Sequence, residues 1–294
     1  MTKSTRSPWA CVRRRPRWRR RRSMSLVTTP AIVLQTYRYS ETSKVVRLAT
    51  RDLGVQSAIA KGALRPKSRF GAGLELLSEG MAQLYFRETR ELHTLGAFDL
   101  TNLRRELAAD VGRFAGATAL AEVMLRMAPP APLAPAYDTL VAGLDVLEAM
   151  PSSPPEGVDA AAIRSLWHLV SVLGFAPSLA SCARDGTTIT SQSDAPVAFS
   201  VADGGALCPR CAPTEAASRL PPQAFRDLVA LNDVRATLPL LDSLHAAAHR
   251  RLVARFVRYH LAETSPLSAL DFWEHHAWMA HPAPTHTPIP SAAS

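Results

Sequence analysis

Residues 45–60, Val-Val-Arg-Leu-Ala-Thr-Arg-Asp-Leu-Gly-Val-Gln-Ser-Ala-Ile-Ala, predict two short β-strands joined by a tight turn. Apolar and β-branched residues fill positions 45–50 and 55–60, which have the length of ordinary strands. Arg51-Asp-Leu-Gly54 between them has the composition of a hairpin turn, because Gly54 is free to adopt the positive φ that such turns often need. The hairpin places β-structure in the N-terminal part of the chain.

The segments around this hairpin extend the pattern to about 70 residues, with further short strands expected at 31–36, 74–77, 81–86 and 92–98. Five or six short strands in that length indicate a small barrel, and five-stranded Greek-key barrels are a common nucleic-acid scaffold. Past Asn102 the apolar residues recur at steps of three and four, which predicts helices. The expected helices cover 103–125, 137–150, 160–173 with Gly174 as cap, and 241–259.

The predicted fold class is therefore α+β and multidomain: an N-terminal five-stranded OB-type β-barrel, followed by an α-helical domain with a small zinc-knuckle-like hairpin insertion. We expect a disordered basic tail at 1–23, the OB-fold domain at 24–100, the helical domain at 101–275 and a disordered tail at 276–294. The cysteine-containing insertion is expected at 177–213, with its hairpin formed by 187–190 and 197–201.

The formal net charge of +9 is distributed unevenly. Residues 1–22 hold ten Lys and Arg and no acid, so the remaining 272 residues sum to −1. This tail suits a nonspecific nucleic-acid arm, and its composition also resembles that of an organelle transit peptide. A third interpretation is that translation starts at Met24, directly before the first patterned segment, so that the tail is not part of the working protein.

A local positive patch remains within the folded part, because residues 37–69 hold eight basic residues and two acidic ones, a charge of +6. Its densest part is Lys61-Gly-Ala-Leu-Arg-Pro-Lys-Ser-Arg-Phe70, which we call the basic loop. Gly62 and Pro66 interrupt regular structure, so the cations are expected to follow phosphates while Phe70 stacks on a base. The alternative is a solvated loop with Phe70 in the core.

Two further aromatic residues, Tyr37 and Tyr39, lie two positions apart, which places both rings on one face of an extended strand. They are expected either to face an unpaired nucleic-acid strand or to fill the barrel core.

A second constellation, Cys182-Ala-Arg-Asp185 and Cys208-Pro-Arg-Cys211, has the spacing of two metal knuckles separated by 22 residues. Two Cys-x-x-Cys knuckles would be a strong signal for structural zinc, which takes four ligands in a tetrahedron. Here Asp185 stands in the second position of the first knuckle. A carboxylate oxygen can ligate zinc, so one structural zinc ion held by three cysteines and Asp185 is a candidate. The alternative is a degenerate site held by ordinary packing.

Other classes of function lack their motifs in this sequence. The phosphate-loop, nucleophile-elbow and zinc-protease signatures are all absent. The histidines at 275, 276, 281 and 286 have no partnered carboxylate on a predicted helix or strand. We therefore expect no enzyme. No segment offers about 18 consecutive apolar residues, so no membrane association is expected. Three clustered cysteines in the body are too few for a disulfide framework and favour a reducing cytoplasm. A protein that binds DNA in that compartment is expected at the nucleoid.

The order of barrel, basic loop, helical body and knuckle resembles the bacterial RecO family of recombination mediators, over residues 26–273. Each matching motif is short, and their order and spacing carry the resemblance. The motifs are Ala31-Ile-Val-Leu34, Tyr39-Ser-Glu-Thr-Ser43, Lys61-Gly-Ala63, Lys67-Ser-Arg69, Leu173-Gly-Phe-Ala-Pro177, Gly204-Gly-Ala-Leu-Cys208 and Pro266-Leu-Ser268.

The resemblance implies DNA repair and RecF-pathway recombination, with binding of single-stranded and double-stranded DNA, annealing of complementary strands and help in loading RecA together with RecR. It also implies contact with the C-terminal tail of the single-stranded DNA-binding protein. The family's four-cysteine site occurs in only some members, so Asp185 leaves metal occupancy open. The DNA-contact candidates carried over to this sequence are Arg38, Lys44, Arg47, Lys61, Arg65, Lys67 and Arg69. The alternative function is a helical protein-interaction scaffold with weak nucleic-acid binding.

Overall fold

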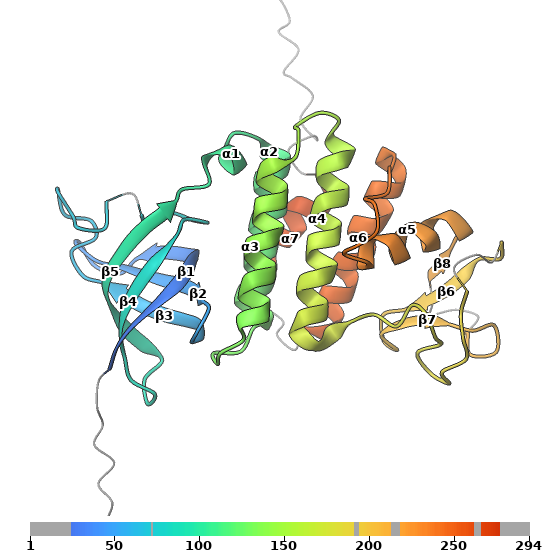
Figure 1. The fold of residues 1–294 in the computed structure, drawn as a ribbon, viewed down its shortest axis with the longest axis horizontal. Coiled ribbons are helices and arrows are strands. Elements are labelled where there is room, and N and C mark those ends of the chain that lie inside the picture. Colours follow the sequence, from blue (N-terminus) through green and yellow to red (C-terminus); the bar gives the residue numbers. More distant parts are fainter. Residues whose placement is uncertain (1–24, 72, 191–193, 213–217, 262–265, 277–294) are drawn as a thin grey trace, which may run out of the picture.

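A β-barrel, a helical bundle and a small sheet follow one another along the long axis of the molecule (Figure 1). The computed structural model describes residues 25–71, 73–190, 194–212, 218–261 and 266–276. The predicted tail at 1–23 and residues 277–294 of the predicted C-terminal tail lie outside these ranges. His276, which the sequence assigned to that tail, is described, and its Nε2 lies 3.0 Å from Asp159 Oδ1. The helical part therefore extends at least to His276.

The predicted five-stranded barrel is present and closed, in the order β1-β2-β3-β5-β4. All neighbours are antiparallel except β3 and β5, which close the barrel through a short parallel pairing around Ala58 and His93. Its interior is filled by alternate apolar residues such as Val33, Leu48 and Leu84. The strands are β1 (Ser25–Arg38), β2 (Lys44–Thr50), β3 (Gly54–Ala60), β4 (Glu79–Phe86) and β5 (Leu92–Asn102).

The strand expected at 74–77 is wrong, because this segment forms consecutive turns. Gly73 N–H donates to Phe70 O and Ser78 N–H to Glu75 O, and Leu77 has φ of 68°. Leu74 and Leu77 are nevertheless buried, so their apolar character reflects core packing and not a strand ladder.

The outer face of the barrel packs directly on the helices. Ile32 and Leu34 on β1 point away from the barrel interior and belong to the same apolar core as the helical bundle, as does Val55 on β3. Polar contacts reinforce this face, since Arg51 Nε lies 2.9 Å from Asp138 Oδ1. The outer face of the barrel thus belongs to the apolar core of the bundle, whereas the barrel interior forms a separate apolar cluster.

The long helix predicted over 103–125 is broken into two. Asp110 interrupts it, because its Oδ1 accepts a hydrogen bond from Arg113 N–H at 2.8 Å and so caps a new helix. The helices α5 and α7 were not predicted, and α5 begins at the Pro221-Pro222 pair, whose φ suits a first helical turn. The helices are α1 (Arg105–Ala108), α2 (Val111–Met127), α3 (Ala134–Ala149), α4 (Pro155–Val170), α5 (Pro222–Asn232), α6 (Ser243–His260) and α7 (Ser268–Glu274).

Helix α4 is the central helix of the bundle. It continues into a π-helical turn, η1 (Ser171–Phe175), whose C-cap is Ala176. The predicted cap Gly174 lies inside this turn, where its φ of 101° interrupts the helical conformation. By length and composition alone, Pro155–Phe175 would be able to cross a membrane, and within the described residues it is the one segment of this kind. Its most apolar window is 61% buried inside the protein, which is what a central bundle helix requires.

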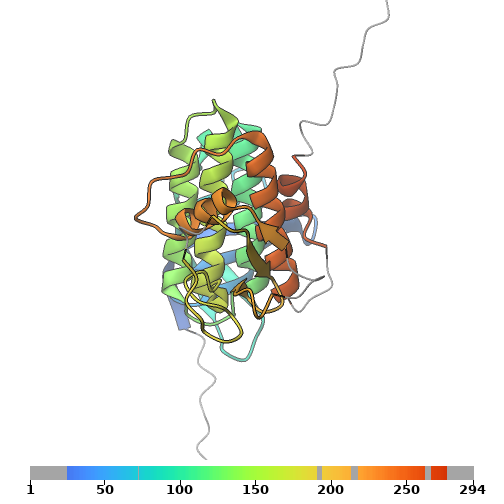
Figure 2. The same cartoon turned by 90° about the vertical axis from the view of Figure 1, so that its right-hand side faces the viewer.

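The small sheet at the far end corrects the expected hairpin of the insertion. β6 (Val197–Ser200) pairs with β7 (Gly205–Leu207) and with β8 (Ser218–Leu220), in the order β7-β6-β8. Residues 187–190 contribute a single bridge between Ser181 and Thr188. The turn at Gly204, with φ of 77°, joins β6 to β7. Figure 2 shows this sheet covering the end of the bundle beside α5 and α6.

Candidate nucleic-acid interface and metal centre

The basic loop is a chain of tight turns at one end of the barrel. Arg65 N–H donates to Gly62 O and Ser68 N–H donates to Arg65 O, both at 3.1 Å, and Gly62 has φ of 76°. Leu64 N–H donates to Thr42 O at 3.0 Å, which holds the basic loop beside the turn between β1 and β2. Two segments about 20 residues apart in sequence therefore share one surface.

The seven predicted DNA-contact residues lie around this end of the barrel. Arg38 and Lys44 are cross-strand partners, and Lys44 pairs in turn with Ala60, the residue before the basic loop. Arg47 lies three residues further along β2, half-buried, and its Nε finds no acceptor among the described residues. Within the described ranges none of the seven forms an ion pair with a carboxylate. We call these residues the cationic rim: Arg38, Lys44, Arg47, Lys61, Arg65, Lys67 and Arg69.

Arg51, which contributes to the local charge of the sequence, is not part of the rim. Its guanidinium binds Asp138 of α3 through two contacts, at 2.9 and 3.1 Å. This partner raises the pKa of Arg51 and lowers the pKa of Asp138. Arg51 therefore connects the barrel to the bundle.

The aromatic residues divide between core and surface, and one expectation is wrong. Phe70 is 3% exposed and packs in the barrel core, so its ring is not available to stack on a base. The Arg69 guanidinium lies over the Phe70 ring, 5.0 Å from its centre. The buried ring therefore helps to position this cation through a cation–π contact. Tyr37 and Tyr39 are 48% and 60% exposed, so the barrel-core alternative is wrong for both. They are the aromatic groups that border the cationic rim.

The predicted knuckle residues come together as a second candidate site. The three sulfurs of Cys182, Cys208 and Cys211 and a carboxylate oxygen of Asp185 all lie within 4.8 Å of one another. Backbone hydrogen bonds shape both knuckles, since Gly186 N–H donates to Cys182 O and Cys211 N–H to Cys208 O. Four donor atoms thus converge from two loops that are far apart in sequence.

Hydrogen bonds and desolvation shift the pKa values of the residues in this cluster. The Thr187 backbone N–H, followed by the Cys182 thiol, lowers the pKa of Asp185. Desolvation acts to raise the pKa of Cys182, but the backbone N–H groups of Cys208, Asp185 and Arg184 outweigh it, so that pKa is lowered. Desolvation and the neighbouring Asp185 raise the pKa of Cys211.

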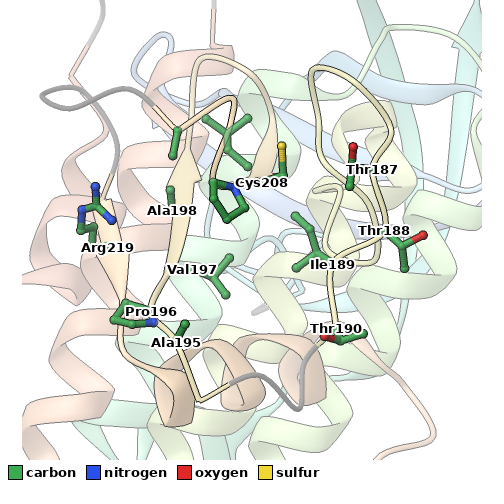
Figure 3. A pocket seen from close by; sticks show the side chains of 13 residues that line it. Thr187, Thr188, Ile189, Thr190, Ala195, Pro196, Val197, Ala198, Cys208 and Arg219 are labelled. Carbon is green, nitrogen blue, oxygen red and sulfur yellow. The ribbon is translucent and has the colours of Figure 1, made fainter.

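This donor set fits a metal ion that accepts sulfur ligands with one oxygen, and zinc is such an ion. The four residues would hold zinc with no open position, and its contribution would be structural, linking the loop at 182–187 to the knuckle after β7. The cluster borders a pocket of about 290 Å³, to which Cys208 contributes. Figure 3 shows Thr187, Thr188 and Ile189 on one side of this pocket and Val197 and Ala198 of β6 on the other.

A second, more apolar pocket of about 850 Å³ lies between α3 and α4. Val146, Val172 and Leu238 contribute its apolar wall. Arg164 and His168 also line this pocket, and their buried Nε and Nε2 atoms find no hydrogen-bond partner within the described residues. Arg164 Nη2 donates to Ala230 O and Thr237 O, both at 3.1 Å. Sequence reasoning missed this site, because its residues come from three separate segments with no common motif.

Comparison with known proteins agrees with this architecture. The family model described as "Recombination protein O N terminal" matches residues 24–104, and "Recombination protein O C terminal" matches residues 108–268. A DNA repair protein RecO from Anaeromyxobacter sp. (strain K) is 32% identical over 247 residues, which cover 81% of this chain and 92% of that protein. The DNA repair protein RecO from Symbiobacterium thermophilum is 35% identical over 190 residues, 64% of this chain and 72% of that protein. The chain therefore belongs to the RecO family of DNA repair and recombination proteins.

Proposed function

We propose that this protein binds single-stranded and double-stranded DNA through the cationic rim, anneals complementary strands and, with RecR, assists the loading of RecA. The observation that carries the proposal is a set of seven cations without carboxylate partners in the described residues, bordered by two exposed tyrosines. Unpaired cations remain available to phosphates, and exposed rings give a stacking surface for bases. The proposed role is that of a mediator without catalytic turnover.

Loop geometry supports backbone contacts over base reading. The basic loop presents its exposed cations from consecutive turns. Reading of base edges uses side chains fixed by a helix or strand within a groove, which this loop does not provide. We therefore expect binding that tolerates sequence and weakens with salt.

The proposal is tested by the triple variant Lys61→Ala, Lys67→Ala, Arg69→Ala. Each lost phosphate contact on a single strand removes about 0.7 from the slope of log affinity against log salt, so three contacts should lower the slope by about 2. The matched control is Arg90→Ala, Arg105→Ala, Arg235→Ala, which removes three exposed charges outside the rim. Equal losses in both variants would show that only total charge matters and would reject the rim.

Annealing is measured on complementary strands coated with the single-stranded DNA-binding protein. The wild type and the control triple variant should accelerate annealing, and the rim variant should not. If the rim variant anneals as fast as the wild type, DNA contact at the rim is not the basis of the activity.

The pocket between α3 and α4 favours a second candidate function, that of a protein-interaction scaffold. Its apolar wall suits a peptide segment, and Arg164, which lines the pocket, supplies a positive charge for a carboxylate such as a chain terminus carries. We propose the C-terminal tail of the single-stranded DNA-binding protein as its occupant. Arg164→Ala should weaken binding of the tail peptide at least tenfold, about 1.4 kcal/mol. Arg235→Ala serves as control, and equal binding by both variants would exclude the pocket.

A further inference from the structure

We infer that Asp185, standing in the place of a fourth thiolate, allows the insertion at 177–213 to stay folded without a bound metal ion. Arg210 acts as the counter-ion of this carboxylate. The inference concerns the cluster of Cys182, Asp185, Cys208 and Cys211 and does not depend on DNA binding by the rim.

The ligand atoms of the cluster are hydrogen-bonded to one another. The sulfurs of Cys208 and Cys211 both lie 3.4 Å from Asp185 Oδ2, so both thiols are placed to donate to one carboxylate oxygen. A carboxylate is a strong acceptor, whereas a thiol sulfur is a weak one. Four thiols without metal would lack a good acceptor, and four thiolates would repel one another. Asp185 therefore gives the thiols of this cluster a hydrogen-bond acceptor within the protein. In a four-cysteine site the bound ion takes that place.

The Asp185 carboxylate has a cationic partner within the protein. Arg210 Nη2 lies 3.1 Å from Asp185 Oδ2 and 3.1 Å from Thr187 Oγ1. Asp185 Oδ1 accepts from Thr187 N–H at 3.0 Å, so both oxygens have partners. The Arg210 side chain is 78% exposed, and such an ion pair contributes little stability by itself. Its effect is to hold a cation beside Asp185 where an ion would otherwise supply the positive charge.

The backbone of the insertion is also held by hydrogen bonds and an ion pair that do not involve the four ligand atoms. Cys182 N–H donates to Thr187 O at 2.7 Å, and Ala183 N–H donates to Ala206 O at 2.9 Å. Arg184 binds Asp203 at 2.7 Å and donates to Cys211 O at 3.0 Å, which ties the second knuckle to the β6–β7 turn. These bonds and the packing of β6 on β7 hold the loops in place without an ion.

The test uses the full chain, with zinc added and after removal of metal by a chelator. Amide hydrogen exchange is followed over residues 197–207, the β6–β7 ladder. In the wild type, removal of metal should change exchange rates by less than about threefold. In Asp185→Cys, which restores a four-cysteine set, removal should raise them by more than about thirtyfold. Asp194→Cys adds a cysteine to the same insertion outside the cluster and should behave as the wild type does.

The inference is overturned if metal removal accelerates exchange in the wild type as much as in Asp185→Cys. A second variant keeps the test decisive where Asp185→Cys does not fold. Arg210→Ala should raise exchange of the metal-free ladder at least about threefold, with zinc restoring protection. If metal-free Arg210→Ala exchanges as slowly as the metal-free wild type, Arg210 is not the counter-ion that stabilises the insertion.

Discussion

The guanidinium of Arg104 lies 2.6 Å from the carboxylate of Glu79, so the first residues beyond the barrel are tied back to strand β4. The Arg104 side chain is 1% exposed and also binds Asp145 and Glu148 of α3, at 2.7 and 3.3 Å. Burial acts to lower the pKa of Arg104, but Asp145 and Glu79 outweigh it and raise that pKa. One side chain thus fixes β4, the linker and α3 relative to one another.

Replacing Arg104 should destabilise the protein substantially. Arg104→Met keeps a long side chain and leaves the carboxylates of Glu79, Asp145 and Glu148 without their cation. Removing one partner of a buried pair costs about 3–5 kcal/mol, and partial exposure of the three carboxylates reduces this to roughly 2–4 kcal/mol. Urea unfolding measures the loss, with the exposed neighbour Arg105→Ala as control, expected within about 0.5 kcal/mol of the wild type. Equal stability of the two variants would contradict the role of Arg104.

Tyr39 should contribute to single-strand affinity without contributing to stability. Tyr39 is 60% exposed beside the cationic rim, so Tyr39→Ala removes a stacking surface and little core packing. Loss of one stacked base should weaken binding by about 1–3 kcal/mol, with thermal stability unchanged. Fluorescence anisotropy with labelled single strands measures the affinity. Tyr259→Ala, which removes an equally exposed tyrosine from α6, should bind as tightly as the wild type. Similar losses in both would argue against stacking at the rim.

The free energy of unfolding should decrease as the pH is lowered, because His249 of α6 binds a proton more readily in the unfolded chain. Desolvation, with a smaller contribution from the nearby His245, lowers the pKa of His249 to about 4. Between about pH 6.5 and 4 the unfolded chain binds a proton at this residue that the folded chain does not, so stability decreases as pH falls through this window. The loss should approach roughly 3 kcal/mol at pH 4.

His249→Phe isolates this effect, because its ring has no titrating nitrogen. Asp227, whose pKa is raised by burial, changes stability in the opposite direction, but it is present in both proteins and cancels in their difference. Chemical denaturation at pH 7 and pH 4.5 should show a smaller acid loss for His249→Phe than for the wild type. Parallel pH profiles would mean that His249 is protonated in the folded protein.

The barrel could be predicted from sequence because its information is local. Alternation over 45–60 and the turn at Gly54 specify a hairpin, and β2 and β3 have almost the predicted bounds. The cysteine cluster was predicted for the same reason, since its spacing is characteristic without any knowledge of the fold. By contrast, Leu74 and Leu77 show that a short apolar run also fits a buried series of turns.

The remaining features depend on contacts between distant segments, which periodicity does not contain. Asp110 is of a type that often caps helices, but the apolar stripe continues across it, and only the capping bond from Arg113 N–H shows that a helix starts there. Phe70 lies among exposed cations, yet it fills the barrel end. The charge of Arg51 was counted with the local patch, whereas its partner Asp138 is 87 residues away in sequence. Charge patterns therefore located the rim but did not separate free cations from paired ones.

Gly54 and Gly62 offer a matched pair that tests how closely the barrel packs on the bundle. Both have positive φ, of 72° and 76°, so alanine at either position carries a similar backbone penalty of about 1 kcal/mol. Their surroundings differ. A Cβ on Gly54 would lie 2.1 Å from the Ala131 carbonyl oxygen, whereas a Cβ on Gly62 would meet only the flexible Arg65 side chain, at 3.6 Å.

Gly54→Ala should therefore destabilise the protein by roughly 2–4 kcal/mol, and Gly62→Ala by about 1 kcal/mol. The excess at Gly54 arises because the backbone of residues 129–131 must move away, and this movement also strains the hydrogen bond from Val55 N–H to Pro129 O. Urea unfolding of the two variants gives the difference directly. If both lose the same stability, the turn at 51–54 does not press against the bundle.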